Sequence, residues 1–166
     1  TEFILTVHLV NDAPELAEIG NRETNEDTPL VLTLEATDVD EDDLILSAVS
    51  QYPGNVVAEV TGNQLTLTPS LDFNGDVTIT VTVIDDGGLS DATEFILTVH
   101  SVNDAPELAE IGAQETDEDT PLVLTLEATD VDEDNLTFIA VSQYPGNVAA
   151  EVTGNQLTLT PTPEWN

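Results

Sequence analysis

The chain has 166 residues, of which 34 are Asp or Glu and one is Lys or Arg, so its formal net charge is −33 at pH 7. This charge excludes nucleic-acid binding and binding to an anionic membrane surface, because both need many Lys and Arg side chains. The absence of cysteine excludes disulfides and thiolate metal sites, and no apolar run approaches the roughly 18 residues of a membrane-spanning helix.

High charge with few aromatic residues is typical of disordered chains, but here 40% of the residues are hydrophobic and they alternate with polar ones. The first eight residues, TEFILTVH, place Phe3, Leu5 and Val7 on one side, which predicts a strand. Similar patterns predict seven further strands, at residues 16–19, 29–38, 44–49, 56–60, 65–68, 77–83 and 93–100. A hairpin turn is predicted at Thr61-Gly62-Asn63.

Seven short strands with turns between them and no helical period predict an all-β fold. The expected architecture is a seven-strand antiparallel sandwich of the immunoglobulin-like type. Phe73 and Trp165 occupy the same position in successive repeats. We expect both to plug one end of the sandwich rather than to stack on sugars.

An internal repeat organises the chain. Residues 1–74 align without a gap to residues 93–166, at an offset of 92 residues, and 61 of these 74 positions are identical. A period of this length predicts self-sufficient domains joined like beads. The expected boundaries are the last strand of a preceding repeat at residues 1–10, a complete domain at residues 11–102, and a second domain at residues 103–166 that lacks its last two strands. We therefore interpret the chain as a window on a longer tandem array, with any export signal and anchor outside it.

Acidic residues gather in the loops rather than in the strands. The clusters are Glu26-Asp27, residues 38–43, Asp72, Asp85-Asp86 and Asn103-Asp104. Like charges packed this closely destabilise a fold unless a cation compensates them. Calcium binds six to eight oxygen ligands and accepts carboxylates, Asn side chains and backbone carbonyls, so it is the ion that this chemistry favours.

The sandwich topology predicts where these loops lie. The loops that follow the second and sixth strands are expected at the end where the chain enters the domain, which brings residues 38–43 and Asp85-Asp86 beside Asn11-Asp12. The loops that carry Glu26-Asp27 and Asp72 are expected at the opposite end, beside the exit linker Asn103-Asp104.

Five motifs in a fixed order, ETNEDTP, ATDVDEDDL, LDFNG, VIDDGGLSD and VNDAP, resemble a cadherin repeat. The chain is most similar to the bacterial cadherin-like tandem repeats of very large surface and secreted adhesins, over essentially its whole length. The resemblance implies calcium bound between consecutive domains by Glu26, Asp38, Asp40, Asp72, Asp85, Asn103, Asp104, Asp130 and Asp132. The acid pattern adds Asn11, Asp12, Asp42, Asp86 and Asp134 as candidate metal ligands.

Two motifs depart from the family pattern. The linker VNDAP lacks the second Asn of the cadherin linker and has Leu9 or Ser101, rather than an acid, two residues before its Asn. The LDFN loop keeps Asp72 but lacks the Glu found there in cadherins. Fewer ligands imply fewer ions at each junction than the three of animal cadherins, and we expect one or two.

The expected function is that of a calcium-rigidified structural spacer in a long extracellular adhesin or surface filament, with adjacent repeats of the same protein as its partners. A homophilic or carbohydrate-binding adhesion module is the alternative. Near-identical repeats with few aromatic residues, however, suit a spacer that gains length from each copy better than a protein that binds several different ligands. An enzyme is not expected, because no nucleophile–His–Asp pattern and no glycine-rich phosphate loop occur in the sequence.

The acidity and the first eight residues each have a rival interpretation. A halophilic protein would also carry an acidic surface with few Lys residues, but it would not cluster the acids at the repeat ends. Residues 1–8 could be donated as a strand to the open sheet of another chain, but this would leave the sixth strand unfilled, so the sequence favours a continuous array.

Overall fold

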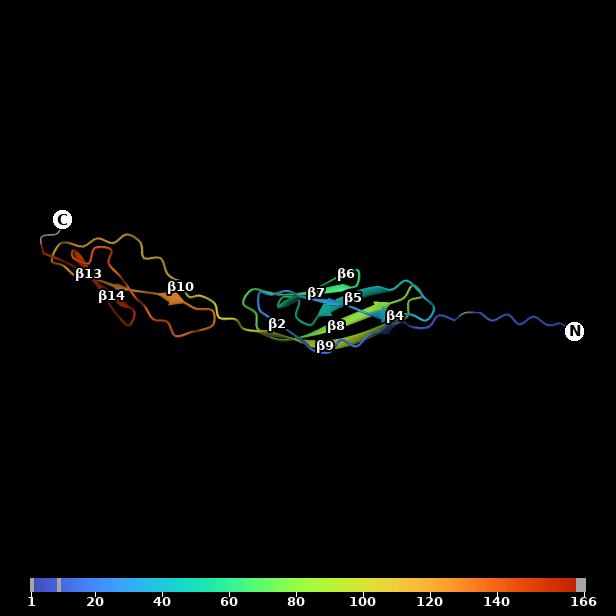
Figure 1. Ribbon diagram of the computed structural model, residues 1–166. Coiled ribbons are helices and arrows are strands. Elements are labelled where there is room, and N and C mark those ends of the chain that lie inside the picture. Colours follow the sequence, from blue (N-terminus) through green and yellow to red (C-terminus); the bar gives the residue numbers. More distant parts are fainter. Residues whose placement is uncertain (1, 9, 164–166) are drawn as a thin grey trace. The chain divides into compact units, whose positions relative to one another are not determined.

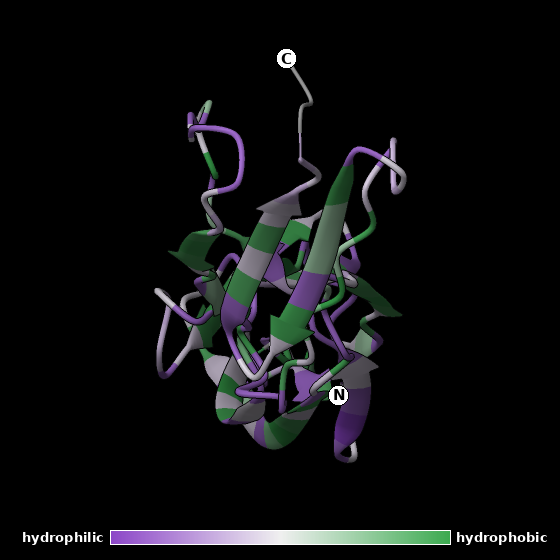
Figure 2. Cartoon of the chain, turned by 90° about the vertical axis from the view of Figure 1, so that its left-hand side faces the viewer, coloured by the Kyte–Doolittle hydropathy of each residue, from purple (hydrophilic) through white to green (hydrophobic). Residues whose placement is uncertain are grey.

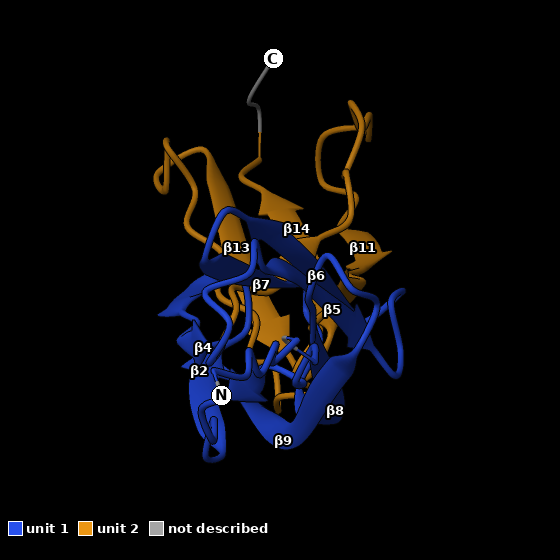
Figure 3. Cartoon of the chain, turned by 90° about the vertical axis from the view of Figure 1, so that its right-hand side faces the viewer, with its two compact units in different colours: residues 1–102 blue, residues 103–166 orange. Residues whose placement is uncertain are grey.

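The computed structural model describes residues 2–8 and 10–163, so Trp165 lies outside the described residues. The chain divides into two compact units, residues 1–102 and residues 103–166, which are coloured separately in Figure 3. The described residues form strands, turns and loops, which confirms the all-β prediction. None of them forms a helix that could cross a membrane.

Unit 1 contains nine strands (Figure 1). They are β1 (Glu15–Leu16), β2 (Arg22–Asn25), β3 (Leu30–Thr33), β4 (Ala36–Thr37), β5 (Ile45–Ser50), β6 (Val56–Thr61), β7 (Gln64–Pro69), β8 (Gly75–Ile84) and β9 (Ser90–His100). A four-stranded sheet has the order β2-β9-β8-β5, a three-stranded sheet has the order β3-β7-β6, and β1 pairs with β4. All these pairs are antiparallel except that of β2 with β9.

Period-two alternation explains the core of this unit. In β8, Val77, Ile79, Val81 and Val83 are fully or almost fully buried, and the threonines between them lie on the outer face. The opposite sheet contributes Leu65 and Leu67 of β7 to the same hydrophobic cluster. Figure 2 shows the resulting bands of hydrophobic and hydrophilic residues along the strands. Burial of the two inner faces is therefore what holds the sandwich together.

Two predicted strands differ in detail from the structure. The predicted strand at residues 29–38 is divided into β3 and β4, because β3 pairs with β7 whereas β4 pairs with β1. The strand β2 was not predicted. Its sequence RETN is polar, and it is a strand because its backbone pairs in parallel with residues 97–100 of β9.

Residues 2–8 form no strand in the structure, and their expected assignment to the last strand of a preceding repeat stays a prediction. They carry the alternating sequence of β9, yet the structure shows them as an unpaired trace (Figure 1). A strand needs a neighbour to satisfy its backbone groups, and the described residues provide none here.

Unit 2 contains β10 (Glu107–Leu108), β11 (Leu122–Thr125), β12 (Ala128–Thr129), β13 (Val148–Thr153) and β14 (Gln156–Pro161). Its three-stranded sheet, in the order β11-β14-β13, repeats the β3-β7-β6 sheet of unit 1. Residues 114–117 and 137–142, which correspond by sequence to β2 and β5, are not strands in the described part of unit 2. Their partners in unit 1 are β9 and β8, and the described residues of unit 2 contain no counterpart of either strand.

Candidate metal centre

The chain enters unit 1 through Asn11 and Asp12, which are tied directly to two acidic loops. The backbone N–H of Asp12 donates to Oδ2 of Asp40 (2.8 Å). The Asn11 side chain donates through Nδ2 to Oδ2 of Asp85 (2.9 Å). The loop after β4 and the loop after β8 therefore meet at the entry end of the unit, as the topology predicts.

Three carboxylates of the loop after β4 converge. Asp38, Asp40 and Asp42 each offer an oxygen, and these oxygens all lie within 4.8 Å of one another. The backbone N–H of Asp40 donates to Oδ1 of Asp38 (2.7 Å), which closes the loop on itself. Glu41 adopts a left-handed conformation with φ of 62°. A non-glycine residue in this region is a local strain that persists only where the surrounding structure demands it.

Among the described residues, no positively charged side chain is bonded to this cluster. Oδ2 of Asp38 is shielded from solvent and accepts no hydrogen bond from any of them. The sole Lys or Arg of the sequence, Arg22, donates instead to the carbonyls of Gly20 and Asn21 (3.0 and 3.1 Å). A shielded carboxylate oxygen without a donor costs free energy, and a bound cation would remove that cost.

Asp85 has the most enclosed carboxylate at this end, because its residue is only 3% exposed. Burial alone would raise the pKa of Asp85. Hydrogen bonds from the Asn11 side chain and from the backbone N–H groups of Leu89, Gly88 and Gly87 outweigh that effect, so its pKa is lowered below the ordinary value of 3.8. The bond from Leu89 to Oδ1 is 2.7 Å long. Asp85 is thus held as a carboxylate beside the entering chain.

Asp42 shows the opposite effect. Desolvation, followed by repulsion from Asp86, Asp38, Asp40 and Asp85, raises the pKa of Asp42 above 3.8. The folded state binds a proton at Asp42 more readily than the unfolded chain does, so the contribution of Asp42 to stability is lost as the pH rises through its folded pKa. The metal-free loop is therefore under electrostatic stress at neutral pH.

Replacement of Asp42 should relieve this stress. In EDTA, we expect Asp42→Asn to have a higher free energy of unfolding than the wild type at pH 7, and the gap should close as the pH falls below the folded pKa of Asp42. Urea unfolding from pH 3 to pH 7 measures the gap. A variant that is less stable than the wild type at pH 7, or a gap that does not change with pH, would contradict this electrostatic account.

Gly87 allows the close approach of Asn11. A Cβ at position 87 would lie 2.6 Å from Cγ, Nδ2 and Oδ1 of the Asn11 side chain. We expect Gly87→Ala to displace Asn11, to break its bond to Asp85, and to lower the free energy of unfolding by about 1–2 kcal/mol. Gly54→Ala is the matched control, because nothing lies within 4 Å of a Cβ there. Urea unfolding compares the two variants, and equal costs would show that the approach of Asn11 is not constrained.

Unit 2 repeats the entry site with its own residues. The backbone N–H of Asp104 donates to Oδ2 of Asp132 (2.7 Å), and the N–H of Asp132 donates to Oδ1 of Asp130 (3.0 Å). The N–H of Asp134 also donates to Oδ1 of Asp130 (3.2 Å). The side chain of Asn103 donates to the carbonyl of Asp104 (2.8 Å). The loop sequence therefore produces this arrangement in each unit separately.

The exit end of unit 1 gathers a second set of acids. Oε1 of Glu26, which is buried, accepts the backbone N–H of Val102 (2.5 Å), and the N–H of Glu26 donates to the carbonyl of His100 (2.9 Å). Oδ1 of Asp27 accepts the N–H of Asp72 (3.4 Å). Asp27 and Asp72 both have left-handed backbones, with φ of 57° and 56°. Carboxylates from two loops thus lie at the point where the chain leaves the unit.

Comparison with known families decides what kind of repeat this is. The model of the cadherin-like domain matches residues 10–100 and again residues 102–166, which together make up nearly the whole chain. The chain belongs to the cadherin-like domain family. No enzyme family matches it, and cadherin-like domains are generally non-catalytic. No curated protein matches the sequence significantly.

Solved structures support the cadherin-like fold. Drosophila N-cadherin EC1-4 has a TM-score of 0.51 at 20% identity, over 92% of this chain and 41% of that chain. Human protocadherin-24 EC1-2 (Form II) also has a TM-score of 0.51, at 15% identity, over 94% of this chain and 83% of that chain. Identities this low show the fold alone. The chain spans less than half the length of the first solved structures that it matches.

The cadherin-like structure brings most of the predicted ligands to two ends of unit 1 and to the entry of unit 2. Asn11, Asp12, Asp38, Asp40, Asp42 and Asp85 meet at the first entry, and Asn103, Asp104, Asp130, Asp132 and Asp134 meet at the second. Glu26 and Asp72 lie at the exit of unit 1. Asp86 is exposed and appears at the entry site only through its repulsion of Asp42. Whether these residues bind metal stays a prediction.

One residue of this cadherin-like unit was not chosen as a ligand from the sequence. Asp27 contacts Asp72 through the hydrogen bond given above, whereas the family resemblance pointed only to its neighbour Glu26. The left-handed backbone of Asp27 turns its carboxylate toward the loop of Asp72, and nothing in the sequence indicates that conformation.

Proposed function

We propose that this chain is a calcium-binding structural spacer, a piece of a long extracellular adhesin or surface filament in which adjacent repeats are its partners. The observation that carries the proposal is the convergence of Asp38, Asp40 and Asp42 around a shielded oxygen of Asp38 that accepts no hydrogen bond from the described residues. Membership of the cadherin-like family supports it, because such domains are typical of extracellular proteins.

Calcium is the ion that this donor set favours. The side-chain atoms that could bind a metal at the entry of unit 1 are oxygens, from the carboxylates and from the amide of Asn11. The sequence contains no cysteine. Hard oxygen donors in an irregular, flexible arrangement suit calcium, whereas magnesium demands nearly octahedral geometry and loses its water reluctantly. Desolvation and then repulsion raise the pKa of Asp42, and an ion held here would neutralise the repulsion.

Calcium would also explain how a chain of such units becomes stiff. Asn11 and Asp12 are linker residues, and both are bonded to the acidic loops of unit 1. An ion bound by those loops would fasten the linker to the unit and remove its freedom to rotate. Near-identical repeats suit this role, because a spacer gains length from every copy and needs no variety of ligand.

The test replaces a carboxylate in the middle of the cluster by an uncharged amide of the same shape. We expect Asp40→Asn to weaken calcium binding at the entry of unit 1 by at least about tenfold, because a charged contact is worth roughly 1.5–3 kcal/mol. The amide oxygen still accepts the N–H of Asp12, so the loop should keep its fold. Calcium titrations followed by the backbone NMR signals of Gly87 to Leu89 report on this site rather than on unit 2.

Asp43→Asn is the matched control. Asp43 lies in the same loop and is exposed, and the corresponding residue of unit 2 is already Asn135. We expect its calcium affinity to stay within about twofold of the wild type. Equal weakening by both substitutions would mean that the loop attracts calcium only through its general charge, and the proposed site would then be wrong.

A further inference from the structure

The outward side chains of β5, β8 and β9 form a face with little charge, although the chain carries a formal charge of −33. The three strands are neighbours in the four-stranded sheet of unit 1 (Figure 3). Their outward positions hold two carboxylates, those of Asp76 and Glu94. The hydroxyl of Thr98 donates to Asp76 (2.7 Å), and that of Thr80 donates to Glu94 (3.1 Å). Two copies of the chain can therefore approach each other at this face with little repulsion.

Exposed aliphatic side chains also stand on this face. Ile45 and Val49 are 68% and 67% exposed, and Ile84 and Ile96 are 39% and 40% exposed. The inward side chains of β8 and β9 fill the core of unit 1, so these outward ones belong to the outer surface of a paired sheet. Ile45 and Ile84 are register partners on adjacent strands and form one apolar ridge. Burial of this ridge would favour association.

A hollow lies on the same face, a short distance along the strands from the ridge. Its volume is about 380 Å³, and it is lined by Val49, Gln51, Thr78, Thr80 and Glu94. Val49 and Thr80 are register partners, and each is four residues from the ridge residue on its own strand. The row that contains Thr82 is midway between them. The ridge and the hollow are thus equally far from Thr82, on opposite sides of it.

We propose that two copies of this chain pair through this face, so that the ridge of each copy sits in the hollow of the other. A two-fold axis in the plane of the contact, running across the strands at Thr82, produces this arrangement. Rotation about that axis exchanges the positions on either side of Thr82. Ile84 of one copy then lies over Thr80 of the other. Ile45 lies over Val49 in the same way, and both contacts occur twice.

Charge supports a second copy as the occupant of this face. A partner rich in Lys and Arg would be attracted to the acidic loops at the ends of unit 1 rather than to this face. A second copy presents the same weakly charged surface. In the symmetric pair Ser90 lies over Glu94, because Ser90 pairs with Ile84 and Glu94 pairs with Thr80. The carboxylate of Glu94 therefore meets a hydroxyl group and not another carboxylate.

The contact adds side-by-side pairing to the proposed spacer and does not depend on the proposed calcium sites. Its residues lie on the strands, whereas the proposed ligands lie in the loops and linkers. Each copy carries a formal charge of −33, so copies repel one another at low ionic strength. Pairing should therefore strengthen as NaCl is added. The experiments are carried out in EDTA, so that calcium cannot link copies through their acidic loops.

Sedimentation velocity of the 166-residue chain over a concentration series, in about 0.5 M NaCl, tests the pairing. We expect a reversible dimer that Val49→Asp weakens at least about tenfold, because it puts a charge into the contact. Val57→Asp is the matched control. Val57 also lies on an edge strand and is 46% exposed, but it belongs to the other sheet. We expect its dimerisation to stay within about twofold of the wild type.

A cross-link tests the position of the axis. The wild-type chain has no cysteine, so Thr82→Cys introduces a single thiol that meets its own copy in the symmetric pair. We expect a short bifunctional thiol reagent to link this variant into covalent dimers. Thr66→Cys, on the outward face of β7, should not be linked.

Four results would overturn the proposal. They are a chain that stays monomeric at every concentration, equal effects of Val49→Asp and Val57→Asp, equal cross-linking of Thr82→Cys and Thr66→Cys, and assembly beyond the dimer. The last would contradict a two-fold contact, because a contact that uses the same face on both copies closes at two. Both aspartate substitutions are at exposed positions, and circular dichroism melts will show that each variant is folded as the wild type is.

Discussion

Calcium at about 10 mM should raise the melting temperature of the chain by roughly 10–20 °C over its value in EDTA. Extracellular calcium modules often bind with a dissociation constant near 10⁻⁴ M, and one such site adds about 2.7 kcal/mol at this concentration. A domain of this size gains about 4–8 °C for each kcal/mol. The physical source is the acid cluster at the entry of unit 1, where desolvation and then repulsion between carboxylates raise the pKa of Asp42.

Two controls separate a specific site from general screening. Magnesium at the same concentration should give a much smaller shift, because it demands octahedral geometry and keeps its water. NaCl at matched ionic strength should also give a small shift, because it only screens the surface charge. Circular dichroism melts of the whole chain measure all three conditions. Equal shifts of the melting temperature with calcium and magnesium, or with calcium and NaCl, would contradict a specific calcium site. The chain would then be only an acidic sandwich repeat.

The placement of the acidic loops could be predicted from the sequence because strand order alone determines it. Alternation locates β5, β6, β7 and β8 to within a few residues, and the antiparallel order then sends the loops after β4 and β8 to the same end. The hydrogen bonds from Asn11 and Asp12 to Asp85 and Asp40 confirm that these loops meet. The left-handed residues Glu41 and Asp27 could not be predicted, since they follow from how each loop closes rather than from propensity.

The limits of pattern reasoning appear where pairing, rather than sequence, decides the structure. The polar sequence of β2 becomes a strand beside β9, while residues 115–116 repeat the Glu-Thr of β2 in unit 2 and remain irregular. Residues 2–8 and residues 94–100 have the same sequence, and only the second copy forms a strand. A β-strand is defined by hydrogen bonds to a neighbour, so the sequence of one segment predicts that it can pair but not whether it does.

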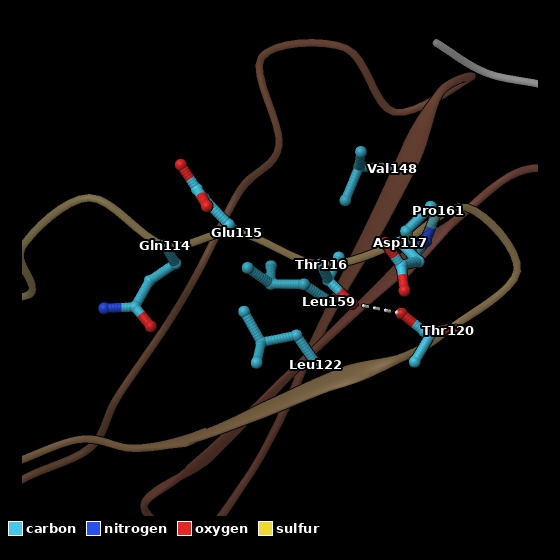
Figure 4. Close-up of a pocket in the computed structure, with 9 residues that line it drawn as sticks. All are labelled: Gln114, Glu115, Thr116, Asp117, Thr120, Leu122, Val148, Leu159 and Pro161. Carbon is cyan, nitrogen blue, oxygen red and sulfur yellow. Dashed lines mark hydrogen bonds between the residues drawn. The ribbon is translucent and has the colours of Figure 1, made fainter.

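A pair of equivalent leucines should show the energetic consequence of this difference. Leu67 in β7 is fully buried between the two sheets of unit 1, whereas its counterpart Leu159 in β14 is partly exposed and lines a pocket of unit 2 (Figure 4). We expect Leu67→Ala to lower the free energy of unfolding of unit 1 by about 2–5 kcal/mol. Leu159→Ala should cost unit 2 roughly half as much or less, because water already reaches its side chain.

Amide hydrogen exchange is the suitable measurement, because it reports the opening free energy of each unit separately. The two substitutions should differ as stated, and equal costs would mean that Leu159 is as well packed as Leu67. The same pair of variants therefore compares the packing of one repeat position in the two units.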